Sequence, residues 1–277
     1  MIKSQNLSAY NEVVKGFQKE CIQNNISITS IYDLNGKMKM GQKVARKIRK
    51  KKPDIVLSIG VLATTVVKEK IKDIPIVFCM VINHERFKLS GPNITGISTE
   101  IAIEDQFNGY QSILGQLKNI GVIYDPSKTG IIIKNAEIKM KHLGISLAKY
   151  EVTSSRKISE ALENLIGKID ALVTTVLSGS NHRASIKSST IENKVPLLCT
   201  SDVFVKAGAL AAVSSDYNYV GSQAAGLAAK ILELPALSSL GIVNPDYFKL
   251  SINTDTAEEL GLEVKLVLED PKINIYP

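Results

Sequence analysis

The sequence has little of what most catalytic and membrane proteins need. It has no tryptophan, and its three cysteines (Cys21, Cys79 and Cys199) lie far apart without a CxxC pair, so neither a disulfide framework nor a cysteine-bound metal is expected. The histidines show no HxxxH-type spacing, which argues against a metal site. G-x-G-x-x-G and G-x-x-x-x-G-K-[ST] are both absent, so we expect no cofactor and no nucleotide.

Long apolar runs are also missing. The longest, such as IPIVFCMVI, are strand-sized and fall well short of the roughly 18 residues of a membrane span. The opening MIKSQNLSAY has no apolar stretch of the signal-peptide kind. We therefore expect either a cytosolic protein or one whose secretion segment is not part of this chain.

Positive charge is unevenly distributed. The net charge is +7, and KVARKIRKKKP (43–53) holds a large share of the basic residues. A basic excess can indicate nucleic acid, a membrane surface or a solvated surface. Met40, Val44 and Ile48 recur every four residues, which predicts an amphipathic helix with its lysines in water. Without aromatic–basic interleaving or a helix-turn-helix pattern, nucleic acid is not an expected partner.

The periodicity alternates between strands and helices along the chain, which is typical of βαβ units and a parallel sheet. DIVLSIG (54–60) is a continuous apolar run of the kind found in strands buried on both faces. We expect further strands near 27–33, 75–81, 120–125, 145–152, 170–176, 195–202 and 208–215. Helices are expected near 8–23, 62–71, 127–142, 155–167, 181–192 and 217–234. TxxE at Thr256–Glu259 predicts a capping box for a short helix ended by Gly261.

An internal echo divides the chain. PDIVLSIG…KDIPIVFCM resembles IDALVTTV…NKVPLLCTSD: an aspartate, a buried strand, a helix, then proline and a second buried strand. Two such halves indicate two lobes of one topology. NITGISTEIA (93–102) lies where the chain would first cross between them.

Polar side chains follow the predicted strands. Ligands of open parallel sheets bind beyond the carboxyl ends of the strands. Ser58, Gly60, Ala63, Thr64 and Thr65 surround a turn that opens a helix, and a helix N-terminus favours an anion such as a carboxylate. The threonines could equally cap that helix.

The other strand ends supply acidic, amide and hydroxyl groups. They carry Asn83, Tyr124, Asp125, Ser178, Ser201, Asp202, Asp216 and Tyr217. Together with the anion-favouring turn they would suit a zwitterion, with its ammonium at Asp202 or Asp216. The alternative is that Asp125 and Asp216 are helix N-caps. No GxSxG elbow or cysteine–base pair supports catalysis, so an enzyme is not expected.

Several segments together resemble the ABC-transporter substrate-binding family that includes tryptophan- and tyrosine-type binding proteins. They are NLSAYNEVVKGFQKE, DIVLSIGVLATTVV with DIPIVFCMV, PNITGIS, LKNIGVIYDPS, VPLLCTSDVFVKAGALAAVSSDYNYVGSQAAGLAAKIL and LSINTDTAEELGLEV. The resemblance implies an α/β fold of two Rossmann-like lobes with parallel sheets, the type I periplasmic-binding architecture, with a three-segment hinge. It implies ligand contacts at Ser58, Gly60, Ala63, Thr64 and Thr65, at the Ser201-Asp202 turn and at Asp216.

The function implied is solute binding for an ABC importer. The lobes, expected at 1–97 plus about 216–240 and at 98–215 plus about 241–277, would close on a small-molecule solute, an amino acid or similar carboxylate-bearing compound. The chain would be a monomer that meets a membrane permease transiently, in the periplasm or another extracytoplasmic space, with a lipid anchor in a longer form. A chain without tryptophan departs from the aromatic walls expected around an aromatic amino acid, so the resemblance does not name the solute. The alternatives are an effector-sensing domain of a transcription regulator, which would need a DNA-binding segment, and a cytosolic α/β enzyme.

Overall fold

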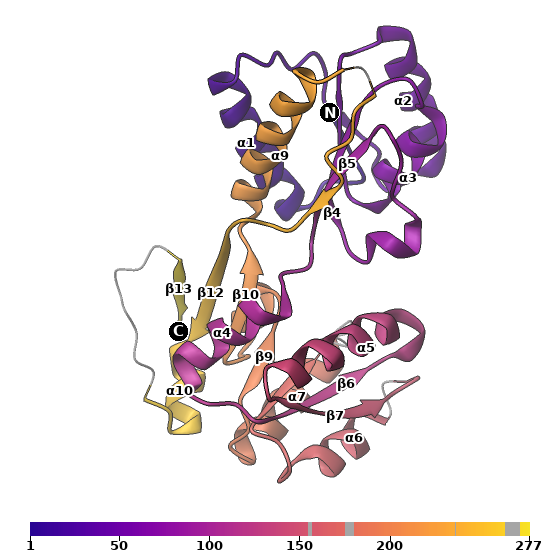
Figure 1. Cartoon of the computed structure of the whole chain (residues 1–277). Helices are drawn as coiled ribbons and strands as arrows, with labels where there is room; N and C mark the ends of the chain where they lie inside the picture. The colour runs from indigo at the N-terminus through magenta and orange to yellow at the C-terminus, as the bar shows by residue number, and fades with distance from the viewer. Residues whose placement is uncertain (155–156, 175–179, 236, 264–271) are drawn as a thin grey trace. The chain divides into compact units, whose positions relative to one another are not determined.

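The protein consists of two compact units, shown in Figure 1 by a computed structural model. Unit 1 comprises Met1–Ile101 and Ser215–Tyr247, and unit 2 comprises Ala102–Ser214 and Phe248–Pro277. The chain therefore passes from one unit to the other three times. The structure describes residues 1–154, 157–174, 180–235, 237–263 and 272–277.

Unit 1 is a parallel sheet covered by helices. Its six strands lie in the order β11-β5-β4-β3-β1-β2. The strands are β1 (Ile2–Lys3), β2 (Tyr32–Asp33), β3 (Val56–Ile59), β4 (Ile76–Val81), β5 (Ile94–Ser98) and β11 (Ile242–Val243). The helices are α1 (Ser8–Gln23), α2 (Met38–Lys51), α3 (Val61–Lys70), the 3-10 helix η1 (His84–Phe87) and α9 (Tyr217–Leu232).

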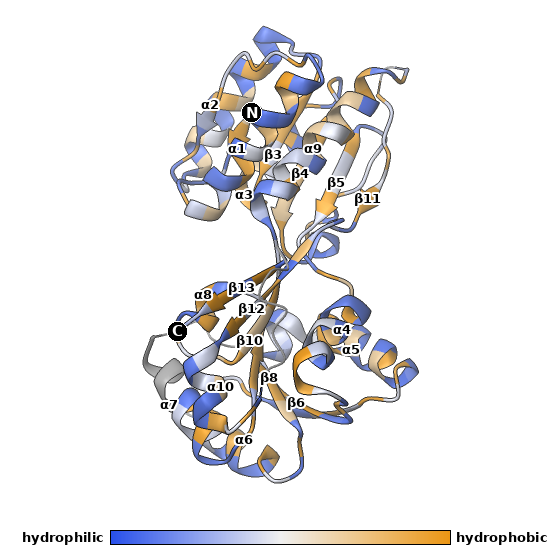
Figure 2. Ribbon diagram, turned by 90° about the vertical axis from the view of Figure 1, so that its left-hand side faces the viewer, coloured by the Kyte–Doolittle hydropathy of each residue, from blue (hydrophilic) through white to orange (hydrophobic). Residues whose placement is uncertain are grey.

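The apolar runs form the centre of this sheet. All four residues of β3 are buried, as expected for a strand covered on both faces, and Figure 2 shows the strands mostly in the hydrophobic colour. Helices α1 and α9 lie side by side on one face (Figure 1). They approach closely at Gly16 and Gly221, where any Cβ would overlap the backbone of the other helix.

Unit 2 has the same construction. Its seven strands lie in the order β13-β12-β10-β9-β8-β6-β7. The strands are β6 (Asn119–Tyr124), β7 (Ser146–Glu151), β8 (Ala171–Thr174), β9 (Leu197–Cys199), β10 (Ala211–Ser215), β12 (Phe248–Asn253) and β13 (Ile273–Tyr276). The helices are α4 (Ile103–Leu114), α5 (Pro126–His142), α6 (Ile158–Leu165), α7 (Ser180–Glu192), α8 (Asp202–Val205) and α10 (Thr254–Leu260).

The internal echo corresponds to equivalent strand pairs. Its first copy folds as β3 and β4, which pair in parallel with Val56 opposite Ile76. Its second copy folds as β8 and β9, which also pair in parallel, with Leu172 opposite Leu197. The α/β fold class with parallel sheets predicted from the alternation is confirmed.

Some predicted details are wrong. Residues 241–247 were assigned to the second lobe, but β11 pairs with β5 in the unit 1 sheet; a two-residue strand has no periodicity to reveal it. The helix α10 is capped by Asn253, whose Oδ1 accepts from the Thr256 amide at 2.7 Å, whereas Thr256 itself is buried and donates to the Gly208 carbonyl. Gly261 ends α10 in the left-handed conformation, as predicted.

Other differences concern the edges of elements. The strand expected near 27–33 is only Tyr32–Asp33. Met40 is 38% exposed and lies outside the buried face of α2, which consists of Gly41, Val44, Ala45 and Ile48. The helix expected at 155–167 begins at Ile158; residues 155 and 156 lie outside the described part.

Candidate functional site

The turn between β3 and α3 is held by its own hydroxyl groups. Ser58 and Thr64 are completely buried, their oxygens lie 3.1 Å apart, and the Thr64 hydroxyl donates to the Gly60 carbonyl at 2.9 Å. Gly60 has φ +84°, and a Cβ there would collide with the Tyr10 hydroxyl. Ser58, Gly60 and Thr64 therefore shape the turn and are enclosed by it.

Thr65 lies in a different environment. Its Oγ1 is buried and has no hydrogen-bond partner among the described residues. The first backbone amides of a helix lack intrahelical acceptors. In α3, the Ala63 amide instead donates to Ser4 Oγ at 3.0 Å. Thr65, in the N-terminal half of α3, thus has an unused hydroxyl. The dipole of a helix favours an anion near this end.

The ends of β4 and β5 are joined by Glu100. Its Oε1 accepts from the Asn83 amide at 2.6 Å and its Oε2 accepts from the Ser98 hydroxyl at 2.7 Å. His84 Nδ1 lies 3.9 Å from the same Oε2 and is buried without a hydrogen-bond partner. Asn83 is in the left-handed region at φ +53° and caps η1.

Four buried side-chain atoms lack a hydrogen-bond partner in the described part of the chain. They are Thr65 Oγ1, His84 Nδ1, Thr99 Oγ1 and Ser215 Oγ. Thr65, His84 and Thr99 lie in unit 1 beyond strand ends, whereas Ser215 is the last residue of β10, where the chain returns to unit 1. The first three follow β3, β4 and β5, which are neighbours in the sheet. Such groups are rare in folded proteins and require an explanation; at the ligand-binding edge of a parallel sheet, a bound molecule is the simplest one.

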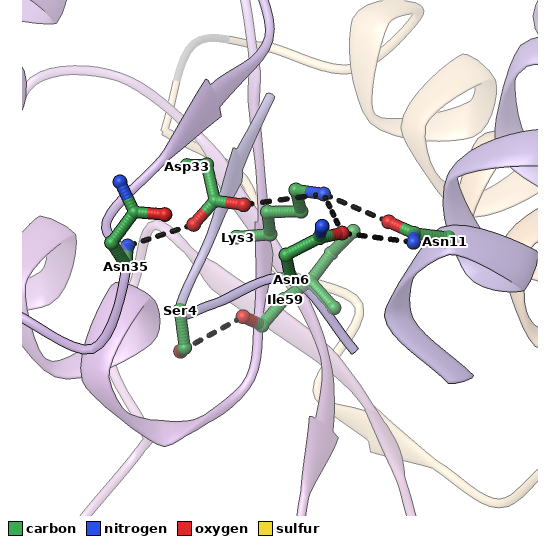
Figure 3. Close-up of polar contacts among 7 residues, drawn as sticks. All are labelled: Lys3, Ser4, Asn6, Asn11, Asp33, Asn35 and Ile59. Atoms are coloured by element: carbon green, nitrogen blue, oxygen red, sulfur yellow. Dashed lines mark hydrogen bonds and ion pairs between the residues drawn. The ribbon is translucent and has the colours of Figure 1, made fainter. Parts of the chain in front are cut away.

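At the carboxyl ends of β1 and β2, the polar side chains are paired with one another (Figure 3). Lys3, at the end of β1, donates to Asn11 Oδ1 at 2.8 Å and to Asn6 Oδ1 at 3.2 Å, and its Nζ lies 3.3 Å from Asp33 Oδ2. Three acceptors match the three donors of an ammonium group. Asp33 also accepts from the Asn35 amide at 2.7 Å. The ends of β1 and β2 therefore leave no unused charge, in contrast to the ends of β3, β4 and β5.

The three aspartates among the predicted ligand residues are all engaged, including Asp202 and Asp216, the two considered for an ammonium group. Asp216 caps α9 by accepting from the Asn218 and Tyr219 amides at 2.9 and 3.0 Å. Asp202 pairs with Lys206 at 3.1 Å and accepts from the Tyr276 hydroxyl at 3.3 Å. The helix-capping alternative thus describes Asp216, and Asp202 already has a cation.

Asp125 is likewise a helix cap. It accepts from the Ser127 amide at 3.0 Å and pairs with Lys128 at 2.8 Å. The bonds from Lys128 and Ser127 lower its pKa to about 2. Its neighbour Tyr124 donates to Glu151 at 2.6 Å, which raises the Tyr124 pKa to about 12.

Three predicted residues remain: Ser201, Tyr217 and Ser178. Ser201 is half-buried and precedes the four-residue helix α8 without a capping bond from its side chain. Tyr217 is half-buried at the start of α9. Ser178 lies outside the described residues.

A cavity of about 540 Å³ opens at the opposite edge of unit 1. Its lining includes Met1, Tyr32, Pro53 and Val56, which lie at or before the beginnings of β1, β2 and β3. Ligands of parallel sheets bind at the other ends of the strands, so we do not assign the site to this cavity.

The described part of the chain offers no cluster of metal-ligating side chains. No group of three or more histidine, cysteine or acidic side chains there could hold a metal ion. All three cysteines are buried, and burial raises the pKa of the Cys79 and Cys199 thiols to about 12.

Sequence reasoning missed Glu100, His84 and Thr99. The signal was present, because all three follow apolar strands. Glu100 stands in the NITGISTEIA segment, which was taken only as a crossover.

The chain is similar in sequence and in structure to known solute-binding proteins. The model of the family described as "ABC transporter substrate binding protein" matches residues 5–270. A tyrosine-binding protein of Clostridioides difficile is 26% identical over 231 residues, covering 80% of this chain and 67% of that protein.

Two solved structures share the fold over essentially the whole chain. A ligand-free, open substrate-binding protein with adhesive properties from Clostridium difficile aligns with a TM-score of 0.83 and 22% identity, covering 99% of this chain and 97% of that chain. A Streptococcus pneumonia ABC domain in complex with L-Trp aligns with a TM-score of 0.67 and 16% identity, covering 100% of this chain and 99% of that one. These likenesses agree with the type I periplasmic-binding architecture predicted from the sequence. None of the described helices is both long and apolar enough to span a membrane.

Proposed function

Because the chain belongs to the ABC transporter substrate-binding protein family, we propose that it binds an amino acid at the carboxyl ends of β3, β4 and β5. Proteins of this family bind a small molecule outside the cytoplasmic membrane and work with an ABC permease; the family is not a class of enzyme. The family membership supports the importer interpretation over the regulator and enzyme alternatives.

The observation that carries the proposal is the set of unpartnered groups at adjacent strand ends. The α-carboxylate would be held at the start of α3, where the Thr65 hydroxyl has no partner and the helix dipole is positive. A carboxylate there would give Thr65 Oγ1 the acceptor it lacks. Hydrogen bonds to a charged group are worth about 1.5–3 kcal/mol.

The α-ammonium would be held by Glu100. Its carboxylate has no lysine or arginine ion pair among the described residues, and its side chain is 35% exposed. It also lies two strands from the start of α3 in the sheet, because β4 separates β3 from β5. Glu100 is a better candidate than Asp202, because Asp202 already has a cation, and than Asp216, because the Asp216 carboxylate is the N-cap of α9.

Tyrosine and tryptophan are the first solutes to test, since the curated relative is a tyrosine-binding protein and one similar structure holds L-Trp. We propose further that unit 2 contributes contacts through the Ser201-Asp202 turn and Tyr124, and that the two units close on the solute. Ligand contacts that exist only in the closed state shift the population toward it.

A thermal-shift series tests the zwitterion directly. A ligand present at a hundredfold excess over its Kd stabilises the native state by about 2.7 kcal/mol. We expect L-tyrosine or L-tryptophan to raise the melting temperature. Tyramine, which lacks the carboxylate, and 3-(4-hydroxyphenyl)propionate, which lacks the ammonium group, should both fail at the same concentration. A shift with a sugar or a nucleoside, and none with any amino acid, would refute the amino-acid proposal.

A further inference from the structure

The segment 37–52, which contains the helix α2, carries more net positive charge than the whole chain, whose net charge is +7. Residues 37–52 hold nine of the 34 lysines and arginines and none of the 27 acidic residues. The remaining residues therefore contain 25 basic against 27 acidic side chains, a net charge of −2. The basic character of the protein comes from this one segment, which we call the α2 patch. It consists of Lys37, Lys39, Lys43, Arg46, Lys47, Arg49, Lys50, Lys51 and Lys52.

All nine residues of the α2 patch are exposed and have no counterion among the described residues. Each of these residues is exposed, and no carboxylate of the described residues forms an ion pair with any of them. The buried face of α2 is made by Gly41, Val44, Ala45 and Ile48. Lys51 donates to the Ser30 hydroxyl at 2.9 Å, which is a neutral partner. The fold thus presents the patch to the outside as uncompensated charge.

The patch is unfavourable for the helix itself. Cations stabilise the last turn of a helix, which accounts for Arg49, Lys50 and Lys51. Lys37 and Lys39 stand at the opposite end, where the dipole disfavours them, and the first turn has no acidic residue. Like charges four residues apart, such as Lys39–Lys43 and Lys43–Lys47, also repel. Local rules broken without a structural gain are typical of functional sites.

Exposed apolar side chains accompany the charge. Met38 is 47% exposed and Met40 is 38% exposed, and both alternate with Lys37 and Lys39 in the first turn of α2. Lysine-rich helices that also expose apolar side chains are found at the interface between water and anionic lipid. A patch made only for solubility would not need the methionines.

We propose that the α2 patch binds the anionic surface of a lipid bilayer. Clusters of four to eight lysines and arginines on an amphipathic helix are sufficient for attraction to acidic headgroups. The family works with a membrane permease, so a bilayer surface is present where the protein acts. Binding there would confine the solute-loaded protein to the plane in which its permease lies.

Vesicle co-sedimentation with matched charge variants tests the proposal. One variant changes Lys43, Lys47 and Lys50 to glutamine, which keeps the stem and the helix propensity. The control changes Lys19, Lys141 and Lys168, exposed lysines outside α2. Both variants have a net charge of +4, three below the wild type, so only the location of the lost charge differs.

The wild type should bind vesicles that contain phosphatidylglycerol and leave vesicles of pure phosphatidylcholine in solution. Each basic residue near an anionic surface raises partitioning about fivefold, so the α2 variant should lose roughly a hundredfold while the control stays close to the wild type. Raising the salt from about 0.1 M to about 1 M should release the wild type, because the Debye length falls from about 10 Å to about 3 Å.

Three outcomes would overturn the proposal. They are equal loss in the two variants, equal binding to the two kinds of vesicle, and binding to double-stranded DNA that is tighter than binding to the acidic vesicles. Melting curves and solute binding of the α2 variant show that it is folded, so that lost vesicle binding cannot be ascribed to unfolding. Relief of like-charge repulsion should leave its melting temperature at or above that of the wild type.

Discussion

Two adjacent threonines show how hydrogen bonding distinguishes a structural residue from a candidate ligand. Thr64 is enclosed and bonded to Ser58 and Gly60, whereas the Thr65 hydroxyl is buried without a partner. The sequence predicts that both belong to a helix start but cannot say which hydroxyl is used by the fold. Successive residues of a helix point about 100° apart, and only the surroundings of each direction distinguish them.

Valine substitutions at these two positions should therefore have opposite effects. Thr64→Val leaves the Ser58 hydroxyl unpaired, and we expect a loss of about 1–3 kcal/mol in the free energy of unfolding. Thr65→Val removes a hydroxyl that lacks a partner, so the melting temperature without solute should hold or rise slightly. Its affinity for the amino acid should fall roughly tenfold to a hundredfold, the equivalent of about 1.5–3 kcal/mol. Calorimetric titration and melting curves on both variants measure these effects. If Thr65→Val binds normally, Thr65 does not hold the carboxylate.

Asp125 should make stability depend on pH in the acid range. Its folded-state pKa of about 2 lies below the usual 3.8 because Lys128 and Ser127 stabilise the charged form. Its contribution is fully present above the unfolded pKa and is lost as the pH falls through the folded value. Asp125→Asn should therefore melt below the wild type at pH 6, with the difference shrinking between about pH 4 and pH 2. Asp54→Asn, an exposed carboxylate without an ion pair in the described part of the chain, is the control. A constant difference across this range would mean that the carboxylate charge is not the cause.

At the scale of the element, strong apolar runs were predicted well and weak patterns were not. The four consecutive buried residues of β3 are typical of a central parallel strand. The helix α4 was missed because only Phe107 and Tyr110 of its twelve residues are buried, which is too few for a clear periodicity. The capping box was assigned to Thr256 when Asn253, three residues earlier, is the cap. Both residue types can cap a helix, and tertiary contacts decided between them.

The packing of α1 against α9 gives a sharp prediction at this scale. A Cβ at Gly221 would overlap the Val13 carbonyl oxygen, whereas one at Gly226 in the same helix meets nothing within 4 Å. Gly221→Ala should therefore force the two helices apart, and overpacking of this kind costs about 1–3 kcal/mol or more. Gly226→Ala should instead stabilise α9 by about 0.5–1 kcal/mol, because alanine is the better helix former. Chemical denaturation of the two variants measures both values, and destabilisation of similar size in both would show that helix contact is not the reason.

At the scale of the whole molecule, the echo in the sequence predicted two similar units but not all of their boundaries. The strand pair in each half consists of apolar runs, which can be predicted from the local sequence. The third crossing, after Tyr247, depends on the two-residue strand β11 joining β5, and no local pattern announces such a pairing. The candidate site shows the same difference between local and long-range information. The turn after β3 was predicted from a local pattern, whereas the role of Glu100 depends on the pairing of β5 with β4.

Closure of the two units on the solute should be visible in solution. If both units contact the amino acid, the bound state is more compact, and saturating solute should lower the radius of gyration measured by small-angle X-ray scattering. The scattering mass should correspond to the 30.2 kDa monomer with and without solute, because an importer component needs its units to move independently of a second copy. Thr65→Val provides the matched control at a solute concentration a few times the wild-type Kd, where the wild type is mostly bound and the weaker-binding variant should mostly keep the scattering of the solute-free protein. A radius that does not change on saturation would refute closure and leave the binding proposal intact, and a mass of twice the monomer would refute the monomer.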